Sequence, residues 1–159
     1  MKITIIAVGK IKEKFYKDAI CEYMKRLSKY CKFEILEVGD EKTPEHASDH
    51  EKQQILEREG SRIASLIKVD SYVIATAIEG KKCDSVSFSH KIENICLKGN
   101  SHITFIIGGS LGLEKEIKKK ANELLSFSDM TFPHQLMRLI LTEQIYRAFR
   151  IMNHEPYHK

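Results

Sequence analysis

The stretch LLSFSDMTFPHQLMRLILTEQIYRAFR, from Leu124 to Arg150, carries the most unusual pattern in the chain. Surface connections are ordinarily polar and rich in glycine, yet the part from Ser126 to His134 holds one ionised group and three large apolar side chains. The ionised group is Asp129, and the apolar residues are Phe127, Met130 and Phe132. We therefore expect a buried loop, whose backbone donors and acceptors need partners from a tightly wound fold or from a polar ligand.

A strong helical pattern follows Pro133 and predicts a helix from about His134 to Met152. Its apolar residues cover more than one narrow stripe: Leu136, Met137, Leu139, Ile140, Leu141, Ile145, Tyr146, Ala148, Phe149, Ile151 and Met152. So wide an apolar surface must be buried on more than one side, either inside the domain or across a subunit interface. In so small a protein we favour a homodimer contact.

Apolar segments and helical patterns alternate along the rest of the chain. We expect strands at residues 2–8, 33–38, 71–78 and 102–107, and helices at about 15–27, 48–67, 87–97 and 113–125. Ser48 and Glu51 form a capping box at the start of the second helix. This order predicts an α/β fold, with a mainly parallel sheet covered by helices on both faces, in a single domain over residues 1–159.

The composition indicates a soluble globular protein, because 42% of the residues are hydrophobic and 30% are charged. No apolar run approaches the roughly 20 residues that span a bilayer, and the start lacks a signal-peptide cleavage pattern. The four cysteines form no C-x-x-C pair, which argues against a zinc site or a disulfide framework and favours the cytoplasm. Pro156 separates His154 from His158, so we expect no metal site there either.

Positive charge is concentrated at the start of the chain. Residues 1–32 hold nine Lys or Arg against three acidic residues, a net charge of +6, whereas the rest holds 17 against 19. A basic helix of this kind fits a polyanionic partner such as nucleic acid, but it also fits an ordinary solvated helix face.

A glycine turn, Gly108 to Gly112, follows the fourth predicted strand. Open α/β sheets place ligands at the carboxyl ends of their strands, where glycines allow close approach of a backbone. The spacing G-G-x-x-G matches neither the dinucleotide fingerprint nor the phosphate loop. A structural turn would need glycine as well, so both interpretations stay open.

Several polar residues around the last helix are candidates for chemistry. His134 lies at the first turn, where the partial positive charge of a helix favours a neutral imidazole and a role as proton acceptor, although a capping role is equally compatible. Arg138 and Arg147 interrupt the apolar surface, which indicates paired or substrate-facing cations. The ending, with Tyr157 and His158, could stack on a base and contact phosphate, or could simply fray.

Four segments together resemble one known family. They are MKITIIAVGKIKEKFYKDAICEYMKRL at the start, FIIGGSLGL, LSFSDMTFPHQLMRLILTEQIYRAFRIM and the ending PYHK. Over essentially the whole chain they are similar to RlmH, the bacterial large-subunit rRNA pseudouridine methyltransferases of the SPOUT class. The resemblance implies an α/β fold whose carboxyl-terminal third forms a deep trefoil knot, a rare exception to the usual rules of connection.

The resemblance also implies a cofactor, S-adenosylmethionine, held bent among three loops. Carried onto this sequence, the cofactor-binding residues are Thr76, Gly108, Gly109, Phe127, Ser128, Asp129, Met130, Thr131 and Phe132. Relatives often have Leu and an acid where this chain has Thr76 and Ala77, so a contact from that acid is absent or replaced.

The implied reaction is methyl transfer to N3 of a pseudouridine in a stem-loop of 23S rRNA, on the assembled ribosome and by a cytoplasmic homodimer. We expect His134 as base or orienting residue, Arg138 as a cation near the base or phosphate, and Tyr157 and His158 closing over the site. The basic first helix would help to bind the RNA. The alternatives are a non-catalytic ribosome-binding factor and a SPOUT ribose methylase that acts on tRNA.

Overall fold

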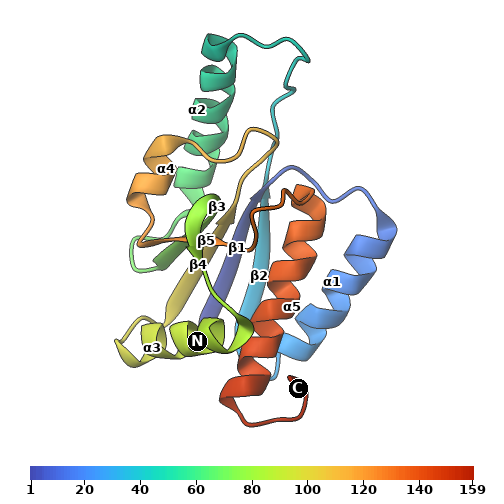
Figure 1. Cartoon of the computed structure of the whole chain (residues 1–159), viewed down its shortest axis with the longest axis vertical. Coiled ribbons are helices and arrows are strands. Elements are labelled where there is room, and N and C mark those ends of the chain that lie inside the picture. The colour runs from blue at the N-terminus through green and yellow to red at the C-terminus, as the bar shows by residue number, and fades with distance from the viewer.

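The structure, a computed structural model, describes residues 1–159 and consists of five strands and five helices. In chain order these are β1 (Lys2–Val8), α1 (Lys14–Leu27), β2 (Lys32–Val38), α2 (Asp49–Leu66), β3 (Tyr72–Lys82), α3 (Ser85–Leu97), β4 (His102–Ile107), α4 (Lys115–Lys120), β5 (Glu123–Ser126) and α5 (His134–Met152). The strands form one sheet in the order β2-β1-β4-β3-β5, and every neighbouring pair is parallel. Figure 1 shows the sheet between its helices.

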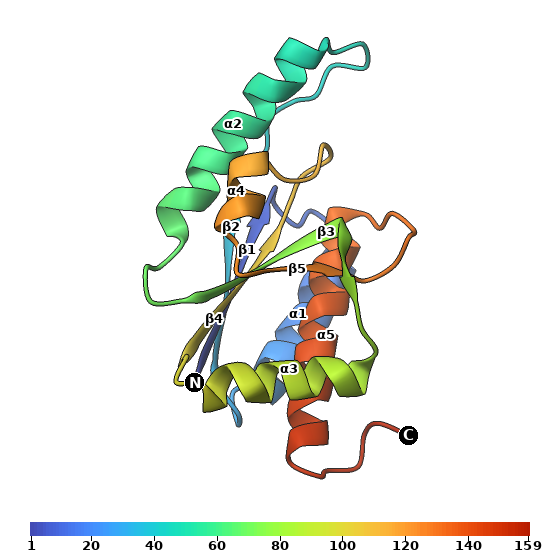
Figure 2. The ribbon, with the colours of Figure 1, turned by 60° about the vertical axis from the view of Figure 1, so that its left-hand side comes forward.

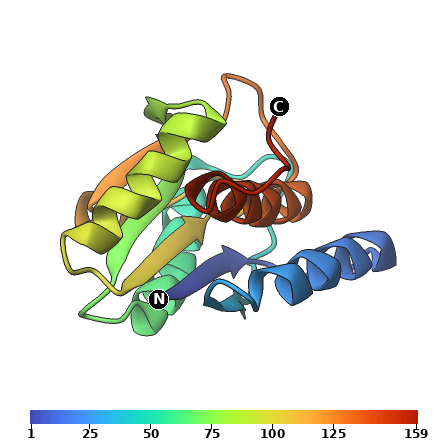
Figure 3. The ribbon, with the colours of Figure 1, turned by 90° about the horizontal axis from the view of Figure 1, so that it is seen from below.

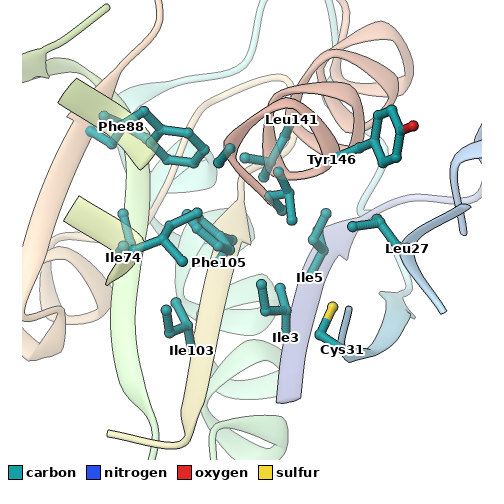
Figure 4. Close-up of a cluster of buried hydrophobic side chains, with 14 of the residues drawn as sticks. Ile3, Ile5, Leu27, Cys31, Ile74, Phe88, Ile103, Phe105, Leu141 and Tyr146 are labelled. Atoms are coloured by element: carbon teal, nitrogen blue, oxygen red, sulfur yellow. The ribbon is translucent and has the colours of Figure 1, made fainter. Parts of the chain in front are cut away.

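Helices cover both faces of the sheet, as the sequence predicts (Figure 2). On one face Ile3, Ile5 and Phe105 pack with residues of α1, α3 and α5, including Phe88 and Leu141 (Figure 4). The hydrophobic cluster on the other face is smaller. There Ile6, Val8 and Ile106 pack with α2 and α4. Residues of β1 alternate between the two clusters because successive side chains of a strand point to opposite faces.

The elements agree with the prediction except near residues 113–126 and at the end of β3. We expected one helix in the first of these regions, but α4 is short and β5 follows it at the edge of the sheet. Its Leu124 and Leu125 pair with Ala75 and Thr76 of β3. Pairing with a neighbouring strand therefore overrides the helical preference of this lysine-rich segment.

β3 continues further than expected and passes close to β5. Its register against β5 shifts between Thr76 and Lys81. A Cβ at Gly80 would lie 2.6 Å from the carbonyl carbon of Leu125 and 2.7 Å from its nitrogen, so only glycine fits this crossing. The trefoil threading that the resemblance implies stays a prediction.

α5 has the predicted bounds and is largely buried by its own chain. It lies beside α1 and α3 and also contacts β1 and β4 (Figure 3). None of its residues is fully exposed. Contacts inside the chain therefore explain much of its wide apolar surface, and the homodimer stays a prediction. No helix is both long and apolar enough to cross a membrane.

Candidate active site

Three segments line an open cavity of about 770 Å³ at the carboxyl edge of the sheet. They are residues 76–79 of β3, the segment 107–113 after β4, and the segment 125–134 that joins β5 to α5. Cavities of roughly 300–1,000 Å³ are typical of small-molecule sites. Eight of the nine residues predicted to bind a cofactor line this cavity: Thr76, Gly108, Gly109, Phe127, Ser128, Met130, Thr131 and Phe132.

The glycine turn closes tightly on itself. A Cβ at Gly108 would lie 2.3 Å from the carbonyl oxygen of Gly112, and the backbone N–H of Gly112 donates to Gly109 O at 3.1 Å. Gly112 has φ +82°, a conformation that favours glycine. The turn thus needs glycine for structural reasons and also forms one wall of the cavity. Beside it, Thr76 Oγ1 donates to Ile106 O at 2.9 Å.

The segment after β5 is less buried than the sequence predicts. Ser126 is buried and Phe127 is half-buried, but Met130 is 75% exposed although it lines the cavity. The backbone N–H of Met130 donates to Ser128 Oγ at 3.0 Å, which shapes the bend. The prediction of a buried loop is therefore wrong, because this segment forms an open wall of the cavity.

Asp129 is the one predicted cofactor residue that does not line the cavity. Its side chain is exposed and forms an ion pair with Lys82. This pair joins the segment after β5 to the end of β3.

His134 lies at the start of α5 and lines the cavity. A Cβ at Gly9, which has φ +83°, would lie 3.3 Å from Nε2 of His134, so the ring packs against the glycine that ends β1. Burial lowers the pKa of His134 below its ordinary 6.5, and the nearby charge of Arg138 lowers it further. The imidazole is therefore neutral at pH 7 and able to accept a proton.

Arg138 lies one turn further along α5 but is completely buried. Its Nη1 donates to Glu37 Oε1 at 2.7 Å, and its Nη2 donates to Val8 O at 2.8 Å. It does not line the cavity. Of the two interpretations from the sequence, a paired or a substrate-facing cation, the structure shows the paired one, because both outer nitrogens bind the ends of β1 and β2. This burial disagrees with the expectation of a cation near the base or phosphate of the substrate.

The carboxyl-terminal tail lies at the far end of α5 from His134 (Figure 1). Tyr157 donates from its hydroxyl to Glu143 Oε1 at 3.0 Å, and Arg147 lies 4.7 Å from the centre of its ring. His158 Nδ1 is 3.4 Å from Arg147 Nη1. Arg147 is 13 residues beyond His134, roughly 20 Å along a helix. Tyr157 and His158 therefore do not close over the cavity of their own chain.

Two charged residues in the cavity wall were not among our candidates. Glu79 and Lys118 both line the cavity and form an ion pair at 2.6 Å, which lowers the pKa of Glu79. Glu79 lies on β3, three residues beyond Thr76. The sequence offered one signal for Glu79, because it is an acidic residue directly after the strand expected at residues 71–78. No group of three or more His, Cys, Asp or Glu side chains is placed to hold a metal ion.

Comparisons with known proteins agree with this arrangement. Residues 1–158 match the family model described as predicted SPOUT methyltransferase. The chain is 62% identical over 159 residues to a Bifidobacterium adolescentis protein and 61% identical to one from Streptococcus uberis, with full coverage of both chains. Both relatives are named ribosomal RNA large subunit methyltransferase H.

A solved structure supports the fold at a greater evolutionary distance. It is a probable methylase family protein from Haemophilus influenzae, with a TM-score of 0.52 at 13% identity. The similarity covers 99% of this chain and 70% of that one.

The parallel sheet, the cavity at its carboxyl edge and the family match define a methyltransferase of the SPOUT class. Within that class the chain belongs to the family of ribosomal RNA large subunit methyltransferase H, RlmH.

Proposed function

We propose that this protein transfers a methyl group from S-adenosylmethionine to N3 of a pseudouridine in the large-subunit rRNA of the assembled ribosome. The observation that carries the proposal is the convergence of three segments on one cavity with a neutral His134 in its wall. Full-length relatives at 57–62% identity carry the name of a large-subunit rRNA methyltransferase. Such a substrate implies action in the cytoplasm, as the cysteine usage predicts.

The cavity fits S-adenosylmethionine in size and in chemistry. Its volume of about 770 Å³ exceeds what a ligand of this size needs, and its lining combines apolar side chains with the glycine turn. Phe127 and Phe132 would contact the apolar parts of the cofactor, and backbone groups of the glycine turn would bind its polar parts. When bound, the cofactor supplies a methyl group that its sulfonium already activates.

The chain itself must hold the reacting nitrogen in line with the methyl carbon. Correct positioning of this kind can supply about 7–11 kcal/mol of a barrier. The N3 proton must also leave, and His134 is the titratable group in the cavity that is suited to take it, because burial keeps its imidazole neutral. We assign Arg138 a positioning role: through Glu37 and Val8 it fixes the first turns of α5 to the strand ends.

We propose further that the protein acts as a homodimer in which the tail of each protomer covers the cavity of its partner. Tyr157 and His158 lie too far from their own cavity to serve it. Apolar side chains that remain half-buried on α5, such as Leu136, Leu139 and Ile140, would contribute to the contact between protomers.

The basic amino-terminal region would bind the RNA. Lys10, Lys12 and Lys17 are exposed and form no ion pair. The backbone N–H of Lys12 donates to Gln135 Oε1 at 2.8 Å, next to His134. This contact holds the basic segment beside the cavity, and RNA affinity should fall steeply with salt concentration.

Calorimetry with the purified protein tests the enzymatic proposal most simply. Saturable binding of S-adenosylmethionine, lost when the cavity is altered, is the expected result. A protein that binds ribosomes but no cofactor would instead be a non-catalytic ribosome-binding factor. A SPOUT ribose methylase for tRNA would bind the cofactor but methylate a ribose oxygen.

A further inference from the structure

A glutamate on α2 lies buried directly behind the glycine turn, although it does not line the cavity. Glu59 is 4% exposed, and its Oε1 accepts a hydrogen bond from the backbone N–H of Glu41 at 2.9 Å. Its other oxygen, Oε2, is buried without a hydrogen-bond partner. Unpaired buried polar atoms are rare in native proteins, so this oxygen calls for an explanation.

The unpaired oxygen lies against the backbone of Gly109. A Cβ at Gly109 would approach Oε2 of Glu59 to 3.0 Å and Val8 Cγ1 to 3.0 Å. Glycine therefore lets the carboxyl group pack directly on the turn. Since that packing leaves little free space, Glu59 blocks movement of Gly109 toward α2.

The next residue of α2 makes a second contact with the same segment. A Cβ at Gly60 would lie 1.9 Å from Oε2 of Glu114, so the side chain of Glu114 fills the space that this glycine leaves. Glu59 and Gly60 thus contact the segment between β4 and α4 near both of its ends, at Gly109 and at Glu114.

The loop after β2 connects α2 to the glycine turn by a third route. Arg62 of α2 donates to Gly39 O at 2.7 Å and also forms an ion pair with Glu41. Further along this loop, Thr43 Oγ1 lies 3.1 Å from Ser110 Oγ. Glu59 contacts both the loop and the turn: its Oε1 binds the loop at Glu41, and its Oε2 packs on the turn at Gly109.

We propose that Glu59 is a positioning residue for cofactor binding. Its Oε1 is fixed by the loop after β2, and its Oε2 packs on Gly109, so that Glu59 holds the glycine turn in place without touching the cofactor. The inference rests on the proposed use of S-adenosylmethionine in this cavity. It explains why an acidic side chain is buried at this position, and it gives α2 a part in the site.

The carboxyl group is suited to this position in its neutral form. Burial raises the pKa of Glu59, and the charges of Asp40 and Glu41 raise it further, while the hydrogen bond from Glu41 N and the charge of Arg62 act in the opposite direction. A negative charge on Oε2 would face Gly109 without a partner. Cofactor affinity should therefore weaken as the pH rises through this raised pKa.

Two conservative substitutions test the proposal by calorimetry with S-adenosylmethionine. Glu59→Asp keeps the acid but shortens the side chain, so it cannot reach both Glu41 and Gly109, and we expect affinity to fall about tenfold or more. Glu59→Gln keeps the length in a neutral group, so we expect near-normal affinity without the loss at higher pH. Glu57→Asp, the same change at an exposed position of α2, is the matched control.

The KM for the cofactor should rise in Glu59→Asp while the KM for RNA stays unchanged, which a general loss of folded protein would not produce. Unchanged cofactor affinity in folded Glu59→Asp would overturn the proposal, and so would a Glu59→Gln protein that loses as much affinity as Glu59→Asp. If the wild-type protein itself bound no S-adenosylmethionine, the proposed function would fail instead, so the two failures are distinguishable.

Discussion

The guanidinium of Arg138 on α5 is bound to the carboxylate of Glu37 on β2, with Nη1 and Oε1 2.7 Å apart. Arg138 is completely buried, whereas the Glu37 side chain is 34% exposed. The same Glu37 oxygen accepts the backbone N–H of Ile11 at 3.0 Å. One carboxylate thus joins α5 to the loop that follows β1. His134 lies at the start of α5 and packs against Gly9 of this loop.

Removing the carboxylate should destabilise the protein markedly. Glu37→Ala leaves a buried guanidinium with only the Val8 carbonyl as partner, and we expect a loss of about 2–3 kcal/mol in the free energy of unfolding, reduced by the partial exposure of Glu37. Urea titration at fixed protein concentration measures this. Asp18→Ala, which breaks an exposed pair with Lys14, should change the stability very little. Equal effects of the two substitutions would contradict the structural role of the pair.

The crossing of β3 and β5 gives a second stability prediction. Gly80→Ala would place a methyl group 2.6 Å from the backbone of Leu125, which cannot move without breaking the sheet pairing. We expect a loss of about 2 kcal/mol or more in stability. In Gly39→Ala the nearest heavy atom is 3.6 Å away, so this control should be tolerated. A thermal unfolding experiment that finds Gly80→Ala as stable as the control would exclude so close a crossing.

These contacts show where sequence patterns reach their limit in this chain. The bounds of α5 and β4 and the capping box of Ser48 and Glu51 follow from local periodicity and capping chemistry, and the structure confirms them. β5 was missed, because Leu124 and Leu125 continue a helical pattern and only their pairing with β3 makes them a strand. The interruption of the apolar surface by Arg138 did indicate a paired cation, but its partner Glu37 is 101 residues away in the sequence, so no local pattern could identify it.

The same limit applies to the candidate site. Residues that the resemblance assigned to the cofactor do gather in one cavity, but the exposure of Met130 and the outward position of Asp129 depend on how the segment after β5 bends. The distance of the tail from its own cavity depends on the length of α5 and on the direction of the tail. The sequence predicts the length of α5 but not the direction of the tail.

His134 should control the rate and its pH dependence. We expect His134→Gln to lower the single-turnover rate by about 10²–10⁴-fold while S-adenosylmethionine binding is largely retained. The active form is the neutral imidazole, and its pKa lies below the ordinary 6.5. Wild-type activity should therefore persist at pH 6.5 and fall only at lower pH. If the substitution instead weakened cofactor binding as much as the rate, His134 would be part of the scaffold.

Mixing two inactive variants tests whether the tail acts on the partner protomer. One variant is His134→Gln, and the other lacks residues 157–159. After subunits exchange, mixed dimers contain one cavity with an intact His134 and an intact tail from the partner. Activity should recover to about a quarter of the wild-type value, because roughly half of the dimers are mixed and each has one complete site. No recovery, despite mixed dimers detected by mass spectrometry, would contradict a tail that serves the partner's cavity.

The most direct test of the proposed reaction is mass mapping of rRNA. Ribosomes from a strain that lacks this protein would be incubated with the purified protein and S-adenosylmethionine, and the large-subunit rRNA digested and compared with an untreated sample. The proposal predicts one added methyl group on the base of a single pseudouridine, at N3, and none with His134→Gln. A methyl group on a ribose oxygen, methylation of added tRNA alone, or no methylation by a protein that binds the cofactor would contradict it.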